Sequence, residues 1–225
     1  MIPLRDDNPS NSTPVVTFAL VALCVITFLW QFTLGPVRGE QAIYALGVIP
    51  SVLFGLQHLP PEIVIVPPVA TMFTSMFMHG GFMHLLGNML YLWIFGDNVE
   101  DSMGHVRFLI FYLLSGLAAV FAQALPAPYS DVPMVGASGA ISGVLGGYVL
   151  LFPQRQVRAI IFNFLTTVPA FVAIGIWIVY QLIVGYMTDP GTGGVAYAAH
   201  IGGFITGIAL IKLFSIGRNA SQQAM

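Results

Sequence analysis

The chain reads GASGAISGVLGGYVLLF at residues 136–152 and VAYAAHIGGFITGIALIKLF at residues 195–214. Both stretches are apolar enough to lie in a membrane, yet the first opens near Ser138 and the second carries His200. Polar side chains are costly inside hydrocarbon. Where a membrane helix contains one, it usually has a functional role. These two stretches therefore decide the fold class and indicate where to look for chemistry.

The composition is that of a membrane protein. Hydrophobic residues make up 57% of the 225 residues, charged residues make up 7%, and the mean hydropathy is +0.86. A soluble domain normally carries about 25% charged residues. The chain is therefore predicted to be an all-α membrane protein with a single domain over residues 1–225. Its net charge of −2, without a basic run, argues against nucleic acid as a partner.

Apolar segments recur along the chain at lengths near the ~20 residues that a membrane-spanning helix needs. Pro and Gly lie between the segments, as expected for the connections. The lipid bilayer is thus a predicted partner, and the fold is predicted to be a six-transmembrane-helix bundle. The predicted spans are residues 14–34, 81–95, 106–125, 136–152, 159–187 and 195–214.

The cations predict the orientation. With six spans both termini lie on one side, and all but one of the 7 Lys and Arg residues fall on that side. Because cytoplasmic loops are enriched in cations, we expect both termini in the cytoplasm, with residues 1–13 and 216–225 as tails. The acidic cluster Asp97, Glu100 and Asp101 is expected to be a solvated end of the second span.

This orientation brings polar residues to one depth. The second, fourth and sixth predicted spans all run from the outside inward. Each carries polar groups near its outer start: His84 and Asn88 in the second, Ser138 in the fourth and His200 in the sixth. Chance placement would scatter such groups, so we expect a polar site in the outer part of the membrane.

Ser138 allows two interpretations. Serine is common where membrane helices pack, and Gly139 and Gly143 follow it as small residues, so packing alone explains the pattern. Alternatively, Ser138 is a nucleophile at a helix N-terminus, where the helix dipole and free N–H groups stabilise developing negative charge.

His200 is open to a similar choice between an interhelical hydrogen bond and catalysis. Gly203 and Gly207 share its helical face, so its helix can approach the glycine-rich fourth span closely. A histidine held against a serine at such a contact forms a nucleophile–base pair. The residues themselves thus favour a serine protease that works inside the membrane.

His84 and Asn88 are spaced i, i+4 and point the same way, either to hold helices together or to donate hydrogen bonds to an oxyanion.

His79 is expected to be structural and near the membrane surface. Its spacing from His84 is not that of a helical zinc pair and no Glu accompanies it, so no metal site is expected. Asp131 and Asp189 fall in predicted external loops, so a Ser–His dyad fits better than a triad.

On these residues the chain resembles the rhomboid family of intramembrane serine proteases. The resemblance covers residues 70–215 well and the preceding segment more loosely. Its motifs are His79-x4-His84-x3-Asn88, Gly136-Ala137-Ser138-Gly139, and Ala199-His200-Ile201-Gly202-Gly203 with Gly207.

The resemblance implies a six-helix rhomboid-like core that needs no cofactor and cleaves single-pass membrane proteins in or near their transmembrane segments. It makes Ser138 the nucleophile and His200 the general base, and builds an oxyanion hole from the Ser138 N–H, His84 and Asn88. The loop at residues 187–194 resembles the family's cap over the site. The compact form favours a bacterial or archaeal plasma membrane.

Two departures from the family pattern stand out. Four residues after the nucleophile, where an aromatic ring often packs on the catalytic histidine, this chain has Ser142. His200 is then held differently, or another ring such as Tyr197 supports it. In the loop after the first span, Arg38 precedes Gly39 in place of the Trp-Arg pair of many members.

The sequence allows two alternatives to a protease. A catalytically inactive rhomboid-like protein could bind membrane clients, but such relatives typically lose the serine or the histidine, and this chain keeps both. A transporter or channel would predict an internal repeat or helices interrupted at mid-depth, and the two halves of the sequence show no convincing repeat.

Overall fold

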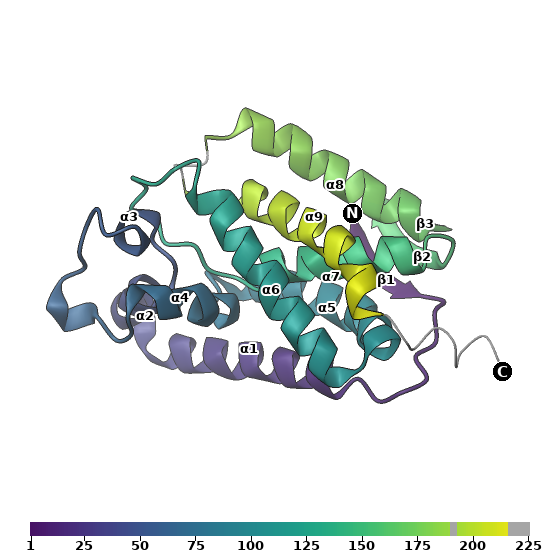
Figure 1. The fold of residues 1–225 in the computed structure, drawn as a ribbon, viewed down its shortest axis with the longest axis horizontal. Coiled ribbons are helices and arrows are strands. Elements are labelled where there is room, and N and C mark those ends of the chain that lie inside the picture. The colour runs from purple at the N-terminus through teal and green to yellow at the C-terminus, as the bar shows by residue number, and fades with distance from the viewer. Residues whose placement is uncertain (190–192, 216–225) are drawn as a thin grey trace.

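Long helices lie side by side in the computed structural model, which describes residues 1–189 and 193–215 (Figure 1). They are α1 (Val15–Thr33), α5 (Phe82–Met103), α6 (His105–Ala124), α7 (Ser138–Leu151), α8 (Ala170–Met187) and α9 (Tyr197–Phe214). α7 packs against α5, α6 and α9, which explains why most of its residues are buried. The predicted tail at residues 216–225 and part of the predicted cap, residues 190–192, lie outside the described residues.

The glycines of α7 and α9 let these two helices approach until their backbones touch. A Cβ atom at Gly203 would lie 2.0 Å from the carbonyl oxygen of Gly139, and one at Gly207 would lie 2.0 Å from that of Gly143. A larger residue at either place would push the helices apart. Close backbone approach through small residues is the usual way in which membrane helices associate.

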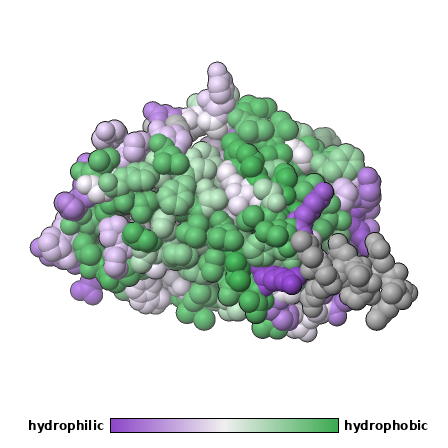
Figure 2. Space-filling model, in the orientation of Figure 1, coloured by the Kyte–Doolittle hydropathy of each residue, from purple (hydrophilic) through white to green (hydrophobic). Residues whose placement is uncertain are grey.

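Several helices have the length and composition of membrane spans. Within residues 1–189 and 193–215 four qualify, namely α1, α6, α8 and α9, and a fifth arises if Pro61–Phe77 and α5, bent by 77°, count as one span. α7 is a shorter apolar helix, so the six spans expected from the sequence stay a prediction. Figure 2 shows apolar side chains over much of the face in view, as in a multi-pass membrane protein.

The connection between α1 and α5 folds into short helices. They are α2 (Gly35–Leu46), α3 (Pro50–Leu53), η1 (Pro61–Ile63), α4 (Pro68–Thr74) and η2 (Ser75–Phe77). Proline stands in the first turn of the first four, where its fixed φ suits a helix start. Val48 forms a β-bridge with Met134, so this connection supports the loop that leads into α7.

A small antiparallel sheet corrects the expectation of an all-α fold. It consists of β1 (Ile2–Asp6), β2 (Gln156–Ile161) and β3 (Phe164–Pro169), with β2 in the middle. Phe162 and Asn163, with φ of 49° and 68°, make the two-residue turn between β2 and β3. The fifth predicted span was therefore wrong at its start: residues 159–169 are strand and turn, and the helix begins at Ala170.

The sheet includes the start of the predicted tail at residues 1–13. Ile2 pairs with Ile160 and Arg5 with Arg158, so the start of the chain is a paired strand. Farther along, Asp101 accepts hydrogen bonds from the backbone N–H of Asn11, at 3.1 Å, and from the Ser12 hydroxyl.

The acidic cluster at the end of α5 is not the solvated helix end that the sequence suggested. Glu100 is fully buried, and its carboxylate accepts hydrogen bonds from the N–H groups of Val16 and Thr17, at 2.9 and 2.7 Å, and from the Thr17 hydroxyl. His105 contacts the same carboxylate. Glu100 thus caps the first turn of α1, where backbone N–H groups lack partners within the helix.

Candidate active site

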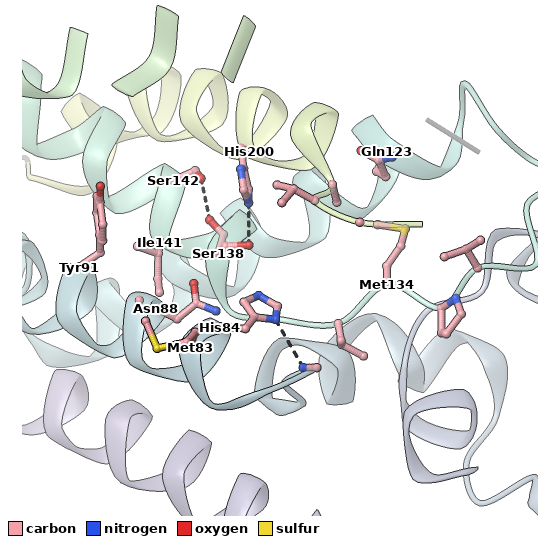
Figure 3. A pocket seen from close by; sticks show the side chains of 18 of the residues that line it. Met83, His84, Asn88, Tyr91, Gln123, Met134, Ser138, Ile141, Ser142 and His200 are labelled. Atoms are coloured by element: carbon pink, nitrogen blue, oxygen red, sulfur yellow. Dashed lines mark hydrogen bonds between the residues drawn. The ribbon is translucent and has the colours of Figure 1, made fainter. Parts of the chain in front are cut away.

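Ser138 and His200 face each other across the contact between α7 and α9. The Ser138 hydroxyl oxygen lies 2.8 Å from Nε2 of His200, a hydrogen-bond distance (Figure 3). Ser138 is the first residue of α7 and His200 lies in the first turn of α9. The backbone contacts at Gly203 and Gly207 hold the two helices close enough for this pair to form.

The backbone before Ser138 depends on glycine. Gly136 has a φ of +124°, a conformation that other residues rarely adopt. A Cβ atom there would also lie 2.7 Å from Nε2 of His84, so a side chain would displace that ring. The Gly136 N–H donates to the carbonyl oxygen of Ser75 at 2.9 Å, which fixes the loop just before the helix starts.

His84 and Asn88 reach the site from α5, opposite the Ser138–His200 pair (Figure 3). The Gly80 N–H points to Nδ1 of His84 at 3.4 Å, which leaves Nε2 to carry the ring proton. Asn88 is buried, and its Nδ2 has no hydrogen-bond partner among the described residues. Both side chains can therefore offer a hydrogen to a ligand.

His79 lies beside His84 and plays a different part. It is fully buried, its Nδ1 lies 3.2 Å from the carbonyl oxygen of Phe77, and its ring meets the ring of His84 edge-on at 5.2 Å. Its own carbonyl oxygen accepts a hydrogen bond from Gln31 of α1 at 3.0 Å. These contacts fit the structural role expected from the sequence.

Two side chains of α8, Gln181 and Trp177, lie against His200. Nδ1 of His200 lies 2.8 Å from the side-chain oxygen of Gln181. The ring of Trp177 lies 5.9 Å from the imidazole, centroid to centroid, and Tyr197 of α9 lies edge-on at 6.4 Å. Ser142 does not contact the imidazole through its hydroxyl, which donates to the carbonyl oxygen of Ser138 at 2.6 Å.

Sequence reasoning named Tyr197 as a possible support but missed Gln181 and Trp177. A signal was present for Gln181: it is the one Gln in an otherwise apolar helix, α8, and it is 5% exposed. A buried amide in a membrane helix needs a partner, so it points to a contact. Its partner could not be deduced, because nothing in the spacing relates residue 181 to His200.

A cavity of about 550 Å³ opens beside the pair. α5, α7 and α8, the loop at residues 130–135 and the segment at residues 194–196 contribute to its walls. Between α5 and α8, Tyr91 and Trp177 approach to 6.4 Å. Within the described residues no three His, Cys, Asp or Glu side chains are grouped so as to hold a metal ion. The geometry suits a hydroxyl nucleophile, a base and donors around one bound carbonyl group.

Comparison with known proteins gives a family. The family model of the Rhomboid domain matches residues 68–216, which include every predicted site residue. The chain is 31% identical over 225 residues to "Rhomboid protein 1, mitochondrial" of Saccharomyces cerevisiae, a match that covers 89% of this chain and 63% of that protein.

Two further relatives come from a bacterium and a plant. "Rhomboid protease GluP" of Bacillus subtilis is 29% identical over 199 residues, which cover 88% of this chain and 34% of that protein. "RHOMBOID-like protein 1" of Arabidopsis thaliana is 31% identical over 198 residues, or 87% of this chain and 46% of that protein. The chain thus spans about a third to two thirds of the length of these relatives.

Proposed function

Because the chain belongs to the rhomboid family, we propose that it is an intramembrane serine protease with Ser138 as nucleophile and His200 as general base. A relative named as a rhomboid protease supports hydrolysis as the reaction class. The observation that carries the assignment is the 2.8 Å contact between the Ser138 hydroxyl and Nε2 of His200. A serine is weakly nucleophilic until a neighbouring base accepts its proton.

In the proposed reaction Nε2 of His200 accepts the Ser138 proton as the serine oxygen attacks the scissile carbonyl carbon. The protonated imidazole then donates this proton to the departing amine, which leaves an acyl ester on Ser138. A water molecule gives a proton to His200 and attacks the ester carbon, and the imidazolium then returns that proton to the departing Ser138 oxygen, which frees the serine. Nε2 of His200 carries the proton in every step, so one base serves acylation and deacylation alike.

We assign the oxyanion hole to the N–H of Ser138, Nδ2 of Asn88 and Nε2 of His84. The first N–H groups of a helix have no partner within the helix, and Ser138 opens α7. Asn88 adds a buried donor without a partner among the described residues. Donors that are fixed before the reaction stabilise the tetrahedral intermediate without reorganisation, and loss of one typically costs about 10²–10³ in rate.

The proposed substrates are single-pass membrane proteins. A transmembrane helix hides its peptide groups in hydrogen bonds, so cleavage is expected near helix-weakening residues and after a small residue. The proposed topology has six spans, with α5 and α7 completing the set and both termini cytoplasmic. The relatives include mitochondrial, plant and bacterial proteins, so they do not favour the bacterial or archaeal plasma membrane expected from the sequence.

The direct test is covalent labelling of the detergent-purified protein with a fluorophosphonate serine probe. Wild type should label, and Ser138→Ala and His200→Ala should not. Ser102→Ala is the matched control, because its hydroxyl bonds only locally, to the carbonyl oxygen of Val99 in α5. Labelling should also require the folded protein and disappear on denaturation.

The inactive, client-binding alternative predicts a different result. Wild-type protein that is folded but does not label, beside an active protease that does, would contradict the proposal and favour client binding. Labelling that persists in Ser138→Ala would place the reactive serine elsewhere in the chain.

A further inference from the structure

His200 can accept the Ser138 proton in only one of its two neutral forms. Nε2 must be unprotonated and face the serine, so the ring hydrogen must sit on Nδ1. Serine proteases with a triad fix this form with a buried carboxylate on Nδ1. Among the described residues that line the cavity here, none is Asp or Glu, so another group has to select the tautomer.

Gln181 of α8 is in position to do so. Its side-chain oxygen lies 2.8 Å from Nδ1 of His200, on the opposite side of the ring from Ser138. An amide oxygen only accepts hydrogen bonds, so this contact requires a hydrogen on Nδ1 and leaves Nε2 free to accept. Gln181 is 5% exposed, which keeps water from competing for the same ring nitrogen.

The ring plane of His200 is also supported from α8. Trp177 lies one helical turn before Gln181, and its ring faces the imidazole at 5.9 Å with an interplanar angle of 35°. Position 142, the place four residues after Ser138, holds a serine whose hydroxyl bonds to the backbone of its own helix. One helix, α8, thus supplies both a ring against the imidazole and a hydrogen-bond acceptor for Nδ1.

We propose that Gln181 is a positioning residue: it holds His200 as the Nδ1–H tautomer, oriented so that Nε2 accepts the Ser138 proton. This inference rests on the proposed function. Gln181 does not contact the reacting atoms, and as a neutral group it fixes the base without offsetting the charge of the imidazolium. The chain then works with a Ser–His–Gln arrangement whose members come from three helices.

Two substitutions separate positioning from packing. Gln181→Met keeps the length of the side chain but removes the acceptor, whereas Gln181→Glu keeps an oxygen acceptor. Positioning predicts that Gln181→Met loses reactivity and Gln181→Glu retains more of it. Packing predicts the reverse, because methionine suits a buried site between helices and a carboxyl group does not. Leu182→Met, on the outward face of the same helix, is the matched control.

The measurement is the second-order rate of fluorophosphonate labelling as a function of pH, which reports serine reactivity without substrate binding. For Gln181→Met we expect a loss of about 10- to 100-fold, part of the ~10²–10⁴ that a general base contributes. For Gln181→Glu we expect the acid limb of the profile to move to higher pH, because a carboxylate beside the ring stabilises its protonated form. Leu182→Met should match wild type.

The outcomes distinguish this inference from the proposed function. If wild type labels and Gln181→Met labels at the same rate, the positioning role is overturned while the protease assignment stands. The same holds if Gln181→Glu is no more reactive than Gln181→Met and its profile keeps the wild-type midpoint. If folded wild type fails to label at all, the proposed function falls and the positioning role falls with it.

Discussion

Glu100 and Asn88 are buried polar residues from the two halves of α5, and their hydrogen bonding differs. At the C-terminal end, both oxygens of Glu100 accept hydrogen bonds, and the partners include the first turn of α1. At the N-terminal end, Asn88 is 7% exposed and its Nδ2 has no partner in the described parts of the chain.

The difference suggests separate roles for the two side chains, Glu100 in holding the fold and Asn88 in binding a ligand. A buried donor without a partner costs about 1–3 kcal/mol, so each one in a structure calls for an explanation. Glu100 joins α5 to α1 and has its partners in the resting protein. Asn88 lines the cavity beside Ser138, where a substrate oxyanion would complete its bonding.

The largest effect on stability is expected for Glu100→Ala. It leaves the N–H groups of Val16 and Thr17 without their acceptor, and each donor left unsatisfied on burial typically costs about 1–3 kcal/mol. Chemical unfolding in detergent measures the loss, and labelling per folded molecule should stay at the wild-type level. Asp97→Ala is the control, because Asp97 bonds to the adjacent N–H of Asn98. Equal loss in both variants would contradict the special role of Glu100.

Asn88→Ala should show the opposite pattern. Loss of one oxyanion donor is expected to reduce kcat by about 10²–10³. Stability should hold or rise slightly, because the substitution removes a buried donor that has no partner in the described protein. Asn98→Ala, at the other end of α5, is the matched control, since its Nδ2 donates to the carbonyl oxygen of Asn8 at 2.7 Å. If Asn88→Ala lost stability in parallel with activity, the result would assign Asn88 a structural role instead.

The smallest expected effect is a difference in activity between two glycine substitutions in the α7–α9 contact. Gly203→Ala and Gly207→Ala each place a Cβ 2.0 Å from a facing carbonyl oxygen, so both should destabilise the protein similarly, by about 1–3 kcal/mol. Gly203 touches Gly139, next to Ser138, whereas Gly207 lies one turn farther along α9. Labelling per folded molecule should therefore fall more in Gly203→Ala. Equal activity in the two folded variants would show that the dyad tolerates a shift of α9.

The sequence predicted most of the helices and the encounter of Ser138 with His200, because hydropathy and small-residue spacing are local signals. It did not predict the sheet. Gln156 and Arg158 alternate with buried Val157 and Ala159, which is a strand pattern, but the apolar residues from 159 onward join it to the next apolar segment and resemble the start of a span. The pairing of β1 with β2 joins residues far apart in the chain, and no local pattern encodes it.

The same limit applies to the site. The sequence could identify the site residues that lie in motifs and at one predicted depth in the membrane. These are Ser138, His200, His84 and Asn88. Glu100 was taken for a solvated residue, because its burial depends on where α1 begins. Gln181 is missed for a related reason. Its role depends on a contact with another helix, α9, and not on its neighbours in the sequence.

If Gln181 positions His200 as proposed, the reactivity of Ser138 depends on how α8 packs against α9. α8 meets α9 closely at Gly185, where a Cβ atom would lie 2.9 Å from that of Tyr197, and many of its other side chains face outward. A lipid or synthetic compound that wedges between α8 and α9 would break this hydrogen bond without entering the cavity. Such a molecule would be an allosteric inhibitor, non-competitive with substrate, and α8 rather than the serine would be its receptor.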